Sequence, residues 1–318
     1  MLVSLLECLS PEDKLAHHEL TENADRGKDA KDDEKRLHCC EVPERIGVGF
    51  GVYPFSIIEP GRNVTTRPLR LKSLRAAWRM RPSHYTDLMD VKRLESNWSG
   101  LCERVAEAAR RSGRAPGDVL IVAVTKLRPA EEVRALVGLG VRDLGENYPQ
   151  ELWRKAEELS DLNVNWHLIG HLQTNKAKKT LPMVRFVHAV DSLKLLRTLN
   201  DLAETIPLPP VCLQVNTSGE ESKHGWTPRE IMDDAGAFAA CGRVPVVGLM
   251  TMAALGTDAE TARPMFAALR RLRDELQTRM GRRLEHLSMG MSNDFEAAVE
   301  EGATLVRVGS LIFEGVSG

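Results

Sequence analysis

Lys126 is the residue of the sequence best suited to nucleophilic chemistry. It follows the apolar, β-branched run Ile121–Thr125, so we expect it to end a buried strand with its ammonium group directed beyond the strand. A lysine that is partly removed from water has a lowered pKa and attacks carbonyl carbons. For Lys126 taken alone, a strand-end lysine whose ammonium group reaches into solvent is the favoured alternative.

Two segments near the carboxyl terminus have the composition of a phosphate site. Gly290 and Ser292 lie in the first segment, and Gly309 and Ser310 lie in the second. The glycines allow the backbone to approach an anion closely, and the hydroxyl groups donate hydrogen bonds to it. A helix beginning near Asn293 would add free N–H groups. The alternative is that Gly290 and Ser292 only form a turn and cap this helix, but two such segments together favour a phosphate site.

An amine and a phosphate site in one cavity suit a phosphorylated aldehyde bound as a Schiff base, and pyridoxal 5′-phosphate (PLP) is the common one. Arg307 lies two residues before Gly309 and therefore on the same face of its strand. It could meet the pyridine nitrogen of PLP. A guanidinium group has no acceptor, so it would leave that nitrogen neutral and support carbanion chemistry weakly. A structural arginine in a salt bridge is the alternative.

The elements that position these residues alternate along the chain, with helical patterns between apolar, β-branched runs. This alternation predicts the α/β class and a single (β/α)8 barrel of the TIM type, in which site residues gather at the carboxyl ends of the strands. A doubly wound sheet is the alternative, but the segment Thr125–Pro129 has no glycine fingerprint for dinucleotides. The predicted strands are Val119–Lys126, Arg142–Glu146, Asn165–His171, Phe186–Asp191, Pro210–Asn216, Pro245–Thr251, Glu285–Gly290 and Thr304–Gly309.

The helices carry their own boundary signals. Apolar residues at three- and four-residue steps predict an amphipathic helix from about Val91 to Arg111. Thr227–Glu230 is typical of a capping box with proline at the first helical position. Asp258 to about Arg279 is expected to be one long helix, which Pro264 either starts or kinks. Ser292–Asp294 is expected to cap a last helix, Phe295 to Glu301.

Composition limits the classes of function. The chain has 318 residues, 42% of them hydrophobic and 5% aromatic, and a formal net charge of −2. This near-neutral balance gives no reason to bind nucleic acid, and no apolar run is long enough for a membrane span. The six cysteines form no CxxC pair, which fits a reducing compartment, so we expect a cytoplasmic protein.

The first 88 residues differ from the rest of the chain. An acidic stretch between residues 11 and 45 is followed by a basic one between residues 61 and 86, and neither has a helix-spaced apolar face. We expect residues 1–88 to be a disordered extension and residues 89–318 to be the PLP-binding barrel. A basic arm for nucleic acid or for an anionic membrane, or a targeting segment, is the less favoured interpretation.

Seven short motifs in the expected order carry a resemblance to a known family. From roughly Met89 to Gly315, the chain resembles the pyridoxal phosphate homeostasis protein family (YggS/PROSC-like), which is similar to the barrel domain of alanine racemase without its second domain. The motifs are Ala123–Lys126, Gly145–Tyr148, His167–Lys176, His188–Ser192, Gly248–Met252, Leu287–Ser292 and Val306–Ser310.

The resemblance implies a role for each site residue. Lys126 would carry PLP as a Schiff base, and Asn147 would lie beside the cofactor. Arg307 would face the pyridine nitrogen, and the phosphate would be held by Ser292, Gly309 and Ser310. The chain departs from the family in having Ser310 where threonine is frequent and His224 where a small residue is usual. The first 88 residues have no counterpart in the family.

Three functions compete. The favoured one is a monomeric, non-enzymatic PLP carrier that serves PLP homeostasis and amino-acid balance, with PLP-dependent apo-enzymes as partners. The alternative is a PLP-dependent amino-acid racemase of weak activity. A racemase needs a second base, and here only Tyr148 stands near the expected site, with no further domain expected after Gly309. The third is a metal-dependent phosphosugar barrel using His167, His171, His188 and Asp191, although a four-residue spacing on a strand separates two side chains by roughly 13 Å.

Overall fold

The computed structural model describes residues 89–220, 224–254 and 256–316. Residues 1–88, which were predicted to be a disordered extension, lie outside the described residues. Among the helices of the described part, none is long and apolar enough to cross a membrane.

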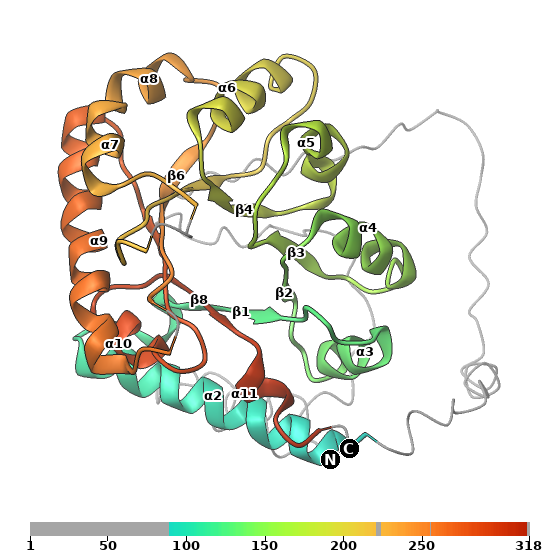
Figure 1. Cartoon of the computed structure of the whole chain (residues 1–318). Helices are drawn as coiled ribbons and strands as arrows, with labels where there is room; N and C mark the ends of the chain where they lie inside the picture. The colour runs from blue at the N-terminus through green and yellow to red at the C-terminus, as the bar shows by residue number, and fades with distance from the viewer. Residues whose placement is uncertain (1–88, 221–223, 255, 317–318) are drawn as a thin grey trace, which may run out of the picture. The chain divides into compact units, whose positions relative to one another are not determined.

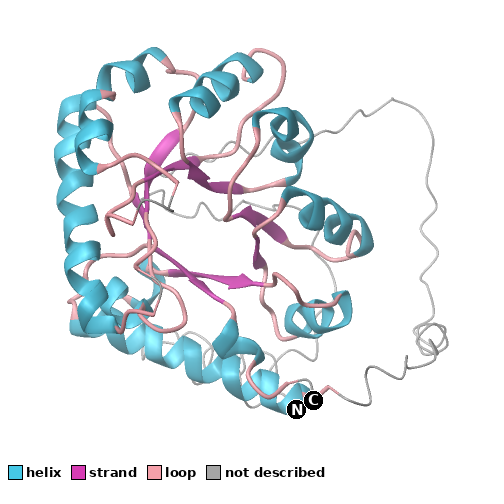
Figure 2. Ribbon diagram, in the orientation of Figure 1, coloured by secondary structure: helices cyan, strands magenta, loops and turns pink. Residues whose placement is uncertain are grey.

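Within the described residues, eight parallel strands close into a barrel in the order in which they occur in the sequence (Figures 1 and 2). Strand β1 pairs with both β2 and β8, and the register of the closing pair places Val122 beside Arg307. The strands are β1 Leu120–Val124, β2 Asp143–Glu146, β3 Asn165–Leu168, β4 Phe186–Val190, β5 Val211–Gln214, β6 Val246–Met250, β7 His286–Ser288 and β8 Leu305–Val308. The predicted barrel class is confirmed.

Each strand lies inside the range predicted for it but is shorter, mostly at its carboxyl end. Lys126, His171 and Asn216, which were predicted to end strands, lie in the connections that follow β1, β3 and β5. These residues therefore belong to the mouth of the barrel rather than to its sheet.

Helices surround the barrel on its outer side (Figure 2). They are α2 Val91–Arg111, α3 Ala130–Gly138, α4 Pro149–Glu158, α5 Thr174–Thr180, α6 Leu193–Leu202, α7 Pro228–Asp233, α8 Ala235–Ala240, α9 Ala259–Met280, α10 Phe295–Glu300 and α11 Ser310–Phe313, with short 3-10 turns at Pro116–Asp118 and Leu181–Met183. The capping box is confirmed, since Thr227 accepts a hydrogen bond from the Glu230 backbone and Glu230 accepts one from the Thr227 backbone. Pro264 lies inside α9, which begins at Ala259, so it does not start this helix.

Helix α2 joins the beginning of the described chain to its end. Its buried face contains Leu94, Leu101, Val105 and Ala108, each at most 3% exposed, and burial of a leucine or valine side chain contributes about 1.5–3 kcal/mol. It runs alongside α10 and α11 (Figure 1). The side chain of Asn97 donates hydrogen bonds to the Ile312 and Glu314 carbonyl groups, at 3.1 and 2.9 Å. This helix therefore holds in place the segment that follows β8.

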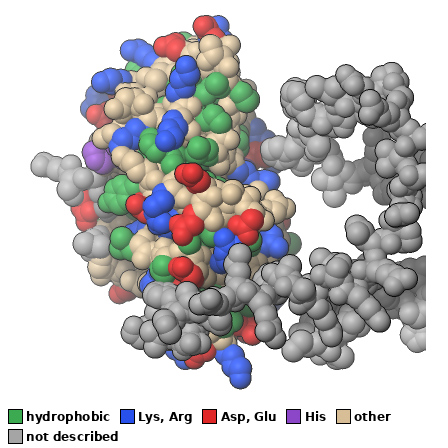
Figure 3. Space-filling view, turned by 90° about the vertical axis from the view of Figure 1, so that its right-hand side faces the viewer, with side chains coloured by type: hydrophobic (Ala, Val, Ile, Leu, Met, Phe, Trp, Pro, Cys, Tyr) green, Lys and Arg blue, Asp and Glu red, His purple; other side chains and the backbone are tan. Residues whose placement is uncertain are grey.

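The surface over α3 and α4 carries both signs of charge (Figure 3). Arg134 pairs with Asp161 on this side of the barrel, and Arg154 pairs with Glu151 and Glu158. Such exposed pairs each contribute at most about 1 kcal/mol to stability. Their interspersed charges agree with the near-neutral composition.

Candidate functional site

The six predicted site residues line one cavity at the mouth of the barrel, with a volume of about 490 Å³. They come from β8 and from the connections that follow β1, β2, β7 and β8, which the closed barrel brings together at the carboxyl ends of its strands. The residues are Lys126 after β1, Asn147 after β2, Ser292 before α10, Arg307 on β8, Gly309 after β8 and Ser310 at the start of α11.

Lys126 lies in a tight turn rather than at the end of β1, and its side chain is exposed. The turn is closed by a hydrogen bond of 3.0 Å from the Arg128 backbone N–H to the Thr125 carbonyl. Leu127 within it has φ +64° and is 93% exposed. This exposure agrees with the alternative in which the lysine reaches into solvent, and the turn places Lys126 beyond the end of β1.

A buried ion pair that the sequence interpretation missed lies beneath this turn. The Lys155 ammonium nitrogen is 2.6 Å from a Glu146 carboxylate oxygen, and both side chains are 1% exposed. The same nitrogen donates to the Thr125 carbonyl at 2.6 Å, and the Thr125 hydroxyl donates to Glu146 at 2.7 Å. The second carboxylate oxygen of Glu146 has no hydrogen-bond partner in the described part of the chain. One signal for Lys155 was available, since it follows the buried Leu152 by three positions and thus lies on the inner face of α4.

Arg307 is held rigidly on β8 and is 4% exposed. Its guanidinium group donates to the Ser288 hydroxyl at 2.5 Å and to the Thr251 carbonyl at 2.9 Å. Burial lowers the pKa of Arg307 to about 10, although the nearby Asp294 carboxylate acts in the opposite direction. The side chain is still a cation at neutral pH, so it presents a fixed donor to the cavity and no acceptor.

The predicted phosphate segments are both close-packed. Gly290 has φ +95°, and a side chain there would come within 2.6 Å of the Ala298 Cβ atom. A Cβ atom on Gly309 would lie 3.0 Å from the Val124 carbonyl oxygen. The hydroxyl groups of Ser292 and Ser310 remain partly or fully exposed to the cavity side. Two connections thus bring backbone and hydroxyl groups to one wall of the cavity.

The predicted cap of the last helix is only partly right. Asp294 occupies the N-cap position of α10, but its carboxylate accepts from the Met291 backbone at 2.6 Å instead of from a helical N–H group. Burial raises the pKa of Asp294 above its ordinary value. Since α10 has six residues, its dipole is a minor contribution, and the hydroxyl and backbone groups are the main donors at this wall.

Asn147 is positioned by a glycine on the next strand connection. A Cβ atom on Gly170 would overlap with the carbonyl and side-chain oxygen atoms of Asn147. Position 170 must therefore be glycine for Asn147 to keep its place at the cavity. Ile169 also lines the cavity.

The histidines separate into two groups. His171 lies at the mouth of the barrel, 2.5 Å from the Asp191 carboxylate, and stacks on His224. His167 and His188 lie in the barrel interior, 3.0 Å apart, in agreement with the interpretation of His167 as a core residue. No group of three metal-ligating side chains occurs among the described residues, so the metal-dependent alternative gains no support there.

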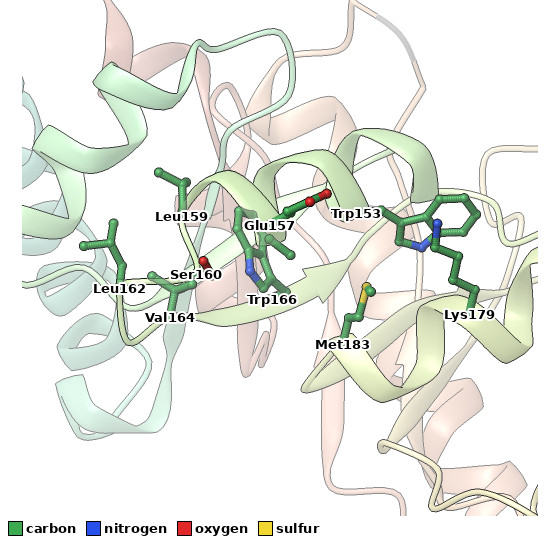
Figure 4. A pocket seen from close by; sticks show the side chains of 10 residues that line it. Trp153, Glu157, Leu159, Ser160, Leu162, Val164, Trp166, Lys179 and Met183 are labelled. Atoms are coloured by element: carbon green, nitrogen blue, oxygen red, sulfur yellow. The ribbon is translucent and has the colours of Figure 1, made fainter.

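A second hollow lies on the outer surface, between α4 and the end of α5 (Figure 4). It is lined mainly by apolar side chains, including Trp166, Leu162 and Met183. Lys179 lies over the ring of Trp153, with 4.0 Å between the ammonium nitrogen and the ring centroid. None of the six predicted residues lines this hollow.

Comparisons with known proteins find one family model and several relatives that are similar to this chain. The family model described as "Alanine racemase, N-terminal domain" matches residues 90–316. The "Pyridoxal phosphate homeostasis protein" of Aquifex aeolicus (strain VF5) is 40% identical over 216 residues, which covers 68% of this chain and 95% of that protein. The protein of the same name from Homo sapiens is 41% identical over 226 residues, covering 66% of this chain and 82% of that protein. The solved structure of PipY from Synechococcus elongatus PCC7942 with PLP bound is similar with a TM-score of 0.59 and 38% identity, covering 66% of this chain and 99% of that chain.

Proposed function

Because this chain belongs to the family of pyridoxal phosphate homeostasis proteins, we propose that it binds PLP as a Schiff base on Lys126 and serves intracellular PLP homeostasis. It holds the cofactor and transfers it to PLP-dependent apo-enzymes, and it influences amino-acid balance through that supply. The PLP-bound PipY structure supports the cofactor. In this chain, the observation that carries the proposal is the convergence of Lys126, Arg307 and two hydroxyl groups on one cavity.

The donor set of the cavity fits PLP. PLP supplies an aldehyde that condenses with a primary amine, a phosphate group, and a pyridine ring whose nitrogen accepts a hydrogen bond. Lys126 contributes the amine, and Ser292 and Ser310 contribute hydroxyl groups to the same cavity. Gly309 allows the backbone to approach the phosphate. Arg307 faces the pyridine nitrogen, and Asn147 lies beside the ring.

The same residues favour holding the cofactor over turning over a substrate. The guanidinium of Arg307 donates and cannot accept, so the pyridine nitrogen stays neutral and electron withdrawal by the ring is weak. Tyr148, the candidate second base of a racemase, is 59% exposed and is absent from the cavity lining among the described residues. These two observations support the carrier function over a racemase of weak activity.

The test uses the full chain titrated with PLP and followed by visible absorbance. We expect the wild type to develop a yellow chromophore, and borohydride reduction to leave the mass of reduced PLP on the peptide that contains Lys126. Lys126→Ala should lose both signals, while Lys178→Ala, which removes an exposed lysine on α5, should keep them. Chromophore or label that survives in Lys126→Ala would overturn the assignment. Rapid exchange of the α-hydrogen of alanine with racemisation would favour the racemase.

A further inference from the structure

A chain of hydrogen bonds crosses the interior of the barrel from Arg307 to Asp143. Arg307 donates to the Ser288 hydroxyl at 2.5 Å, and this hydroxyl lies 2.7 Å from His188 Nδ1. His188 Nε2 lies 3.0 Å from His167 Nδ1, and His167 Nε2 lies 3.0 Å from Asp143 Oδ1. The five residues come from β8, β7, β4, β3 and β2, and the link between β7 and β4 joins strands that are not neighbours in the barrel. We call it the interior hydrogen-bond chain.

Its two ends impose one direction on every donor. Arg307 has only donors, so the Ser288 oxygen accepts from it. At the other end, an ionised Asp143 has only acceptors, so His167 must carry a proton on Nε2. With both imidazoles neutral, His188 then donates from Nε2 to His167 Nδ1, and the unprotonated Nδ1 of His188 accepts from the Ser288 hydroxyl. In this arrangement, each hydrogen bond has one donor and one acceptor.

The surroundings favour these protonation states. Burial lowers the pKa of His188 well below its ordinary value, and the positive charge of Arg307 acts in the same direction. Burial alone would raise the pKa of Asp143, but the hydrogen bond with His167 is among the contacts that outweigh it, so the pKa is lowered. Asn165 also donates to Asp143, at 3.1 Å. The two imidazoles thus lie between the guanidinium of Arg307 and the carboxylate of Asp143.

The interior hydrogen-bond chain also connects the cavity at the mouth of the barrel with the opposite end of the strands. Arg307 lines the cavity at the mouth, whereas Asp143 is the first residue of β2, at the opposite end of the strands, and its side chain is 17% exposed. In an interior of low polarisability, each hydrogen bond strengthens its neighbour by roughly 10–30%. The negative charge of Asp143 therefore affects the hydrogen bonds of Arg307 through three intervening side chains.

We propose that Asp143 is a positioning residue for Arg307: acting through His167, His188 and Ser288, it fixes the guanidinium group and sets how strongly that group donates into the cavity. Resting on the proposed function, the inference further assigns the pyridine nitrogen of PLP as the acceptor of that donation. The Ser288 hydroxyl, which is completely buried, is the link that transmits the effect.

The first test needs no cofactor. Long-range ¹H–¹⁵N spectra of the imidazoles in the full ligand-free chain should show His167 and His188 as neutral rings protonated on Nε2 at neutral pH. Asp143→Asn should displace the ¹H–¹⁵N resonance of the Arg307 guanidinium, because the acceptor at position 143 loses its charge. Glu285→Gln removes a charge from an exposed residue just before β7, outside the interior hydrogen-bond chain, and should leave that resonance in place.

The second test uses PLP labelled with ¹⁵N in its ring. Asp143→Asn and Ser288→Ala should each change the chemical shift of the ring nitrogen, with Ser288→Ala giving the larger change because it breaks the first link. PLP affinity in Asp143→Asn should stay within about threefold of the wild type, a difference of less than 1 kcal/mol. Ser288→Ala interrupts the interior hydrogen-bond chain at the end near Arg307, so it serves as the test if Asp143→Asn does not fold.

The outcomes separate this inference from the proposed function. Protonation of either imidazole on Nδ1, or an unmoved Arg307 resonance in Asp143→Asn, overturns the inference whether or not PLP binds. If the Arg307 resonance moves in Asp143→Asn but the protein does not bind PLP, the positioning role of Asp143 is supported. The pyridine nitrogen is then excluded as the acceptor.

Discussion

The Lys155 ammonium lies 2.6 Å from the Glu146 carboxylate, and this pair is buried directly beneath the turn that carries Lys126. Because Lys155 also donates to the Thr125 carbonyl, it ties α4 to the residue that precedes Lys126. Lys126 is exposed, whereas Lys155 fixes the backbone from which it extends. Five predictions follow from this and related contacts.

Lys155→Met should destabilise the protein by about 3–5 kcal/mol, because it leaves the Glu146 carboxylate buried without its partner. The double variant Lys155→Met with Glu146→Leu should recover much of this loss, since it removes the orphaned charge. Urea unfolding followed by circular dichroism measures both, with Lys178→Met as the matched surface control. A loss of less than about 1 kcal/mol in Lys155→Met would show that the pair does not support the turn.

Gly170→Ala should weaken PLP binding and lower stability, because the added Cβ atom overlaps with Asn147 and must displace it from the cavity wall. Gly138→Ala is the matched control, since nothing lies within 4 Å of a Cβ atom at the end of α3. Parallel PLP titrations and thermal melts of the two variants compare them. Equal PLP affinities in the two proteins would argue against a role for Asn147 at the cofactor.

Ser310→Ala should lower PLP affinity roughly tenfold, which corresponds to the loss of one hydrogen bond to a charged group. Ser310→Thr keeps the hydroxyl and should bind PLP like the wild type. Equilibrium titration of both variants gives the comparison. If the alanine and threonine variants bind equally, the hydroxyl of residue 310 does not hold the phosphate.

Stability should fall as the pH drops below about 6.5, the ordinary pKa of histidine. Burial lowers the pKa values of His188 and His286 in the folded state, so below that pH the unfolded chain binds more protons than the folded one. Each histidine contributes up to about 1.4 kcal/mol per pH unit, a stability that is fully present above pH 6.5 and declines toward the folded pKa. His286→Gln should make the decline less steep. Identical slopes in unfolding series from pH 7 to about pH 5 would rule out a contribution of His286.

A chain that starts at Met89 should fold and bind PLP like the full chain, because helix α2 supplies the contacts that hold the carboxyl-terminal segment. A chain that starts at Ser112 should be unstable, since it loses the buried Leu94 and Leu101 and the hydrogen bonds of Asn97. Expression, melting temperature and PLP titration of the three lengths provide the measurement. Weaker PLP binding by the Met89 chain would assign a role to residues 1–88.

Much of the fold could be predicted from short stretches of sequence. Apolar, β-branched runs marked β1, β4, β6 and β8, because a strand buried on both faces needs apolar residues, whereas β2, β3 and β7 contain no β-branched residue. Strand ends were predicted less well. Lys126 follows an apolar run with no glycine or proline between them, and a periodicity argument alone extends the strand to include it. At His171 the prediction extended the strand past Gly170.

The sequence by itself determined the class of the barrel and predicted six candidate residues that line one cavity, with Asn147 assigned through the family resemblance. Motifs at strand ends must meet once the strands close. Only the tertiary structure decided which buried polar groups pair. Ser288 and His188 are separated by 100 positions and lie on strands that are not neighbours, and Lys155 meets Glu146 from a helix. Hydrophobic patterns are local and can be detected along the chain, but a hydrogen bond across the barrel interior depends on closure and register, which no short segment encodes.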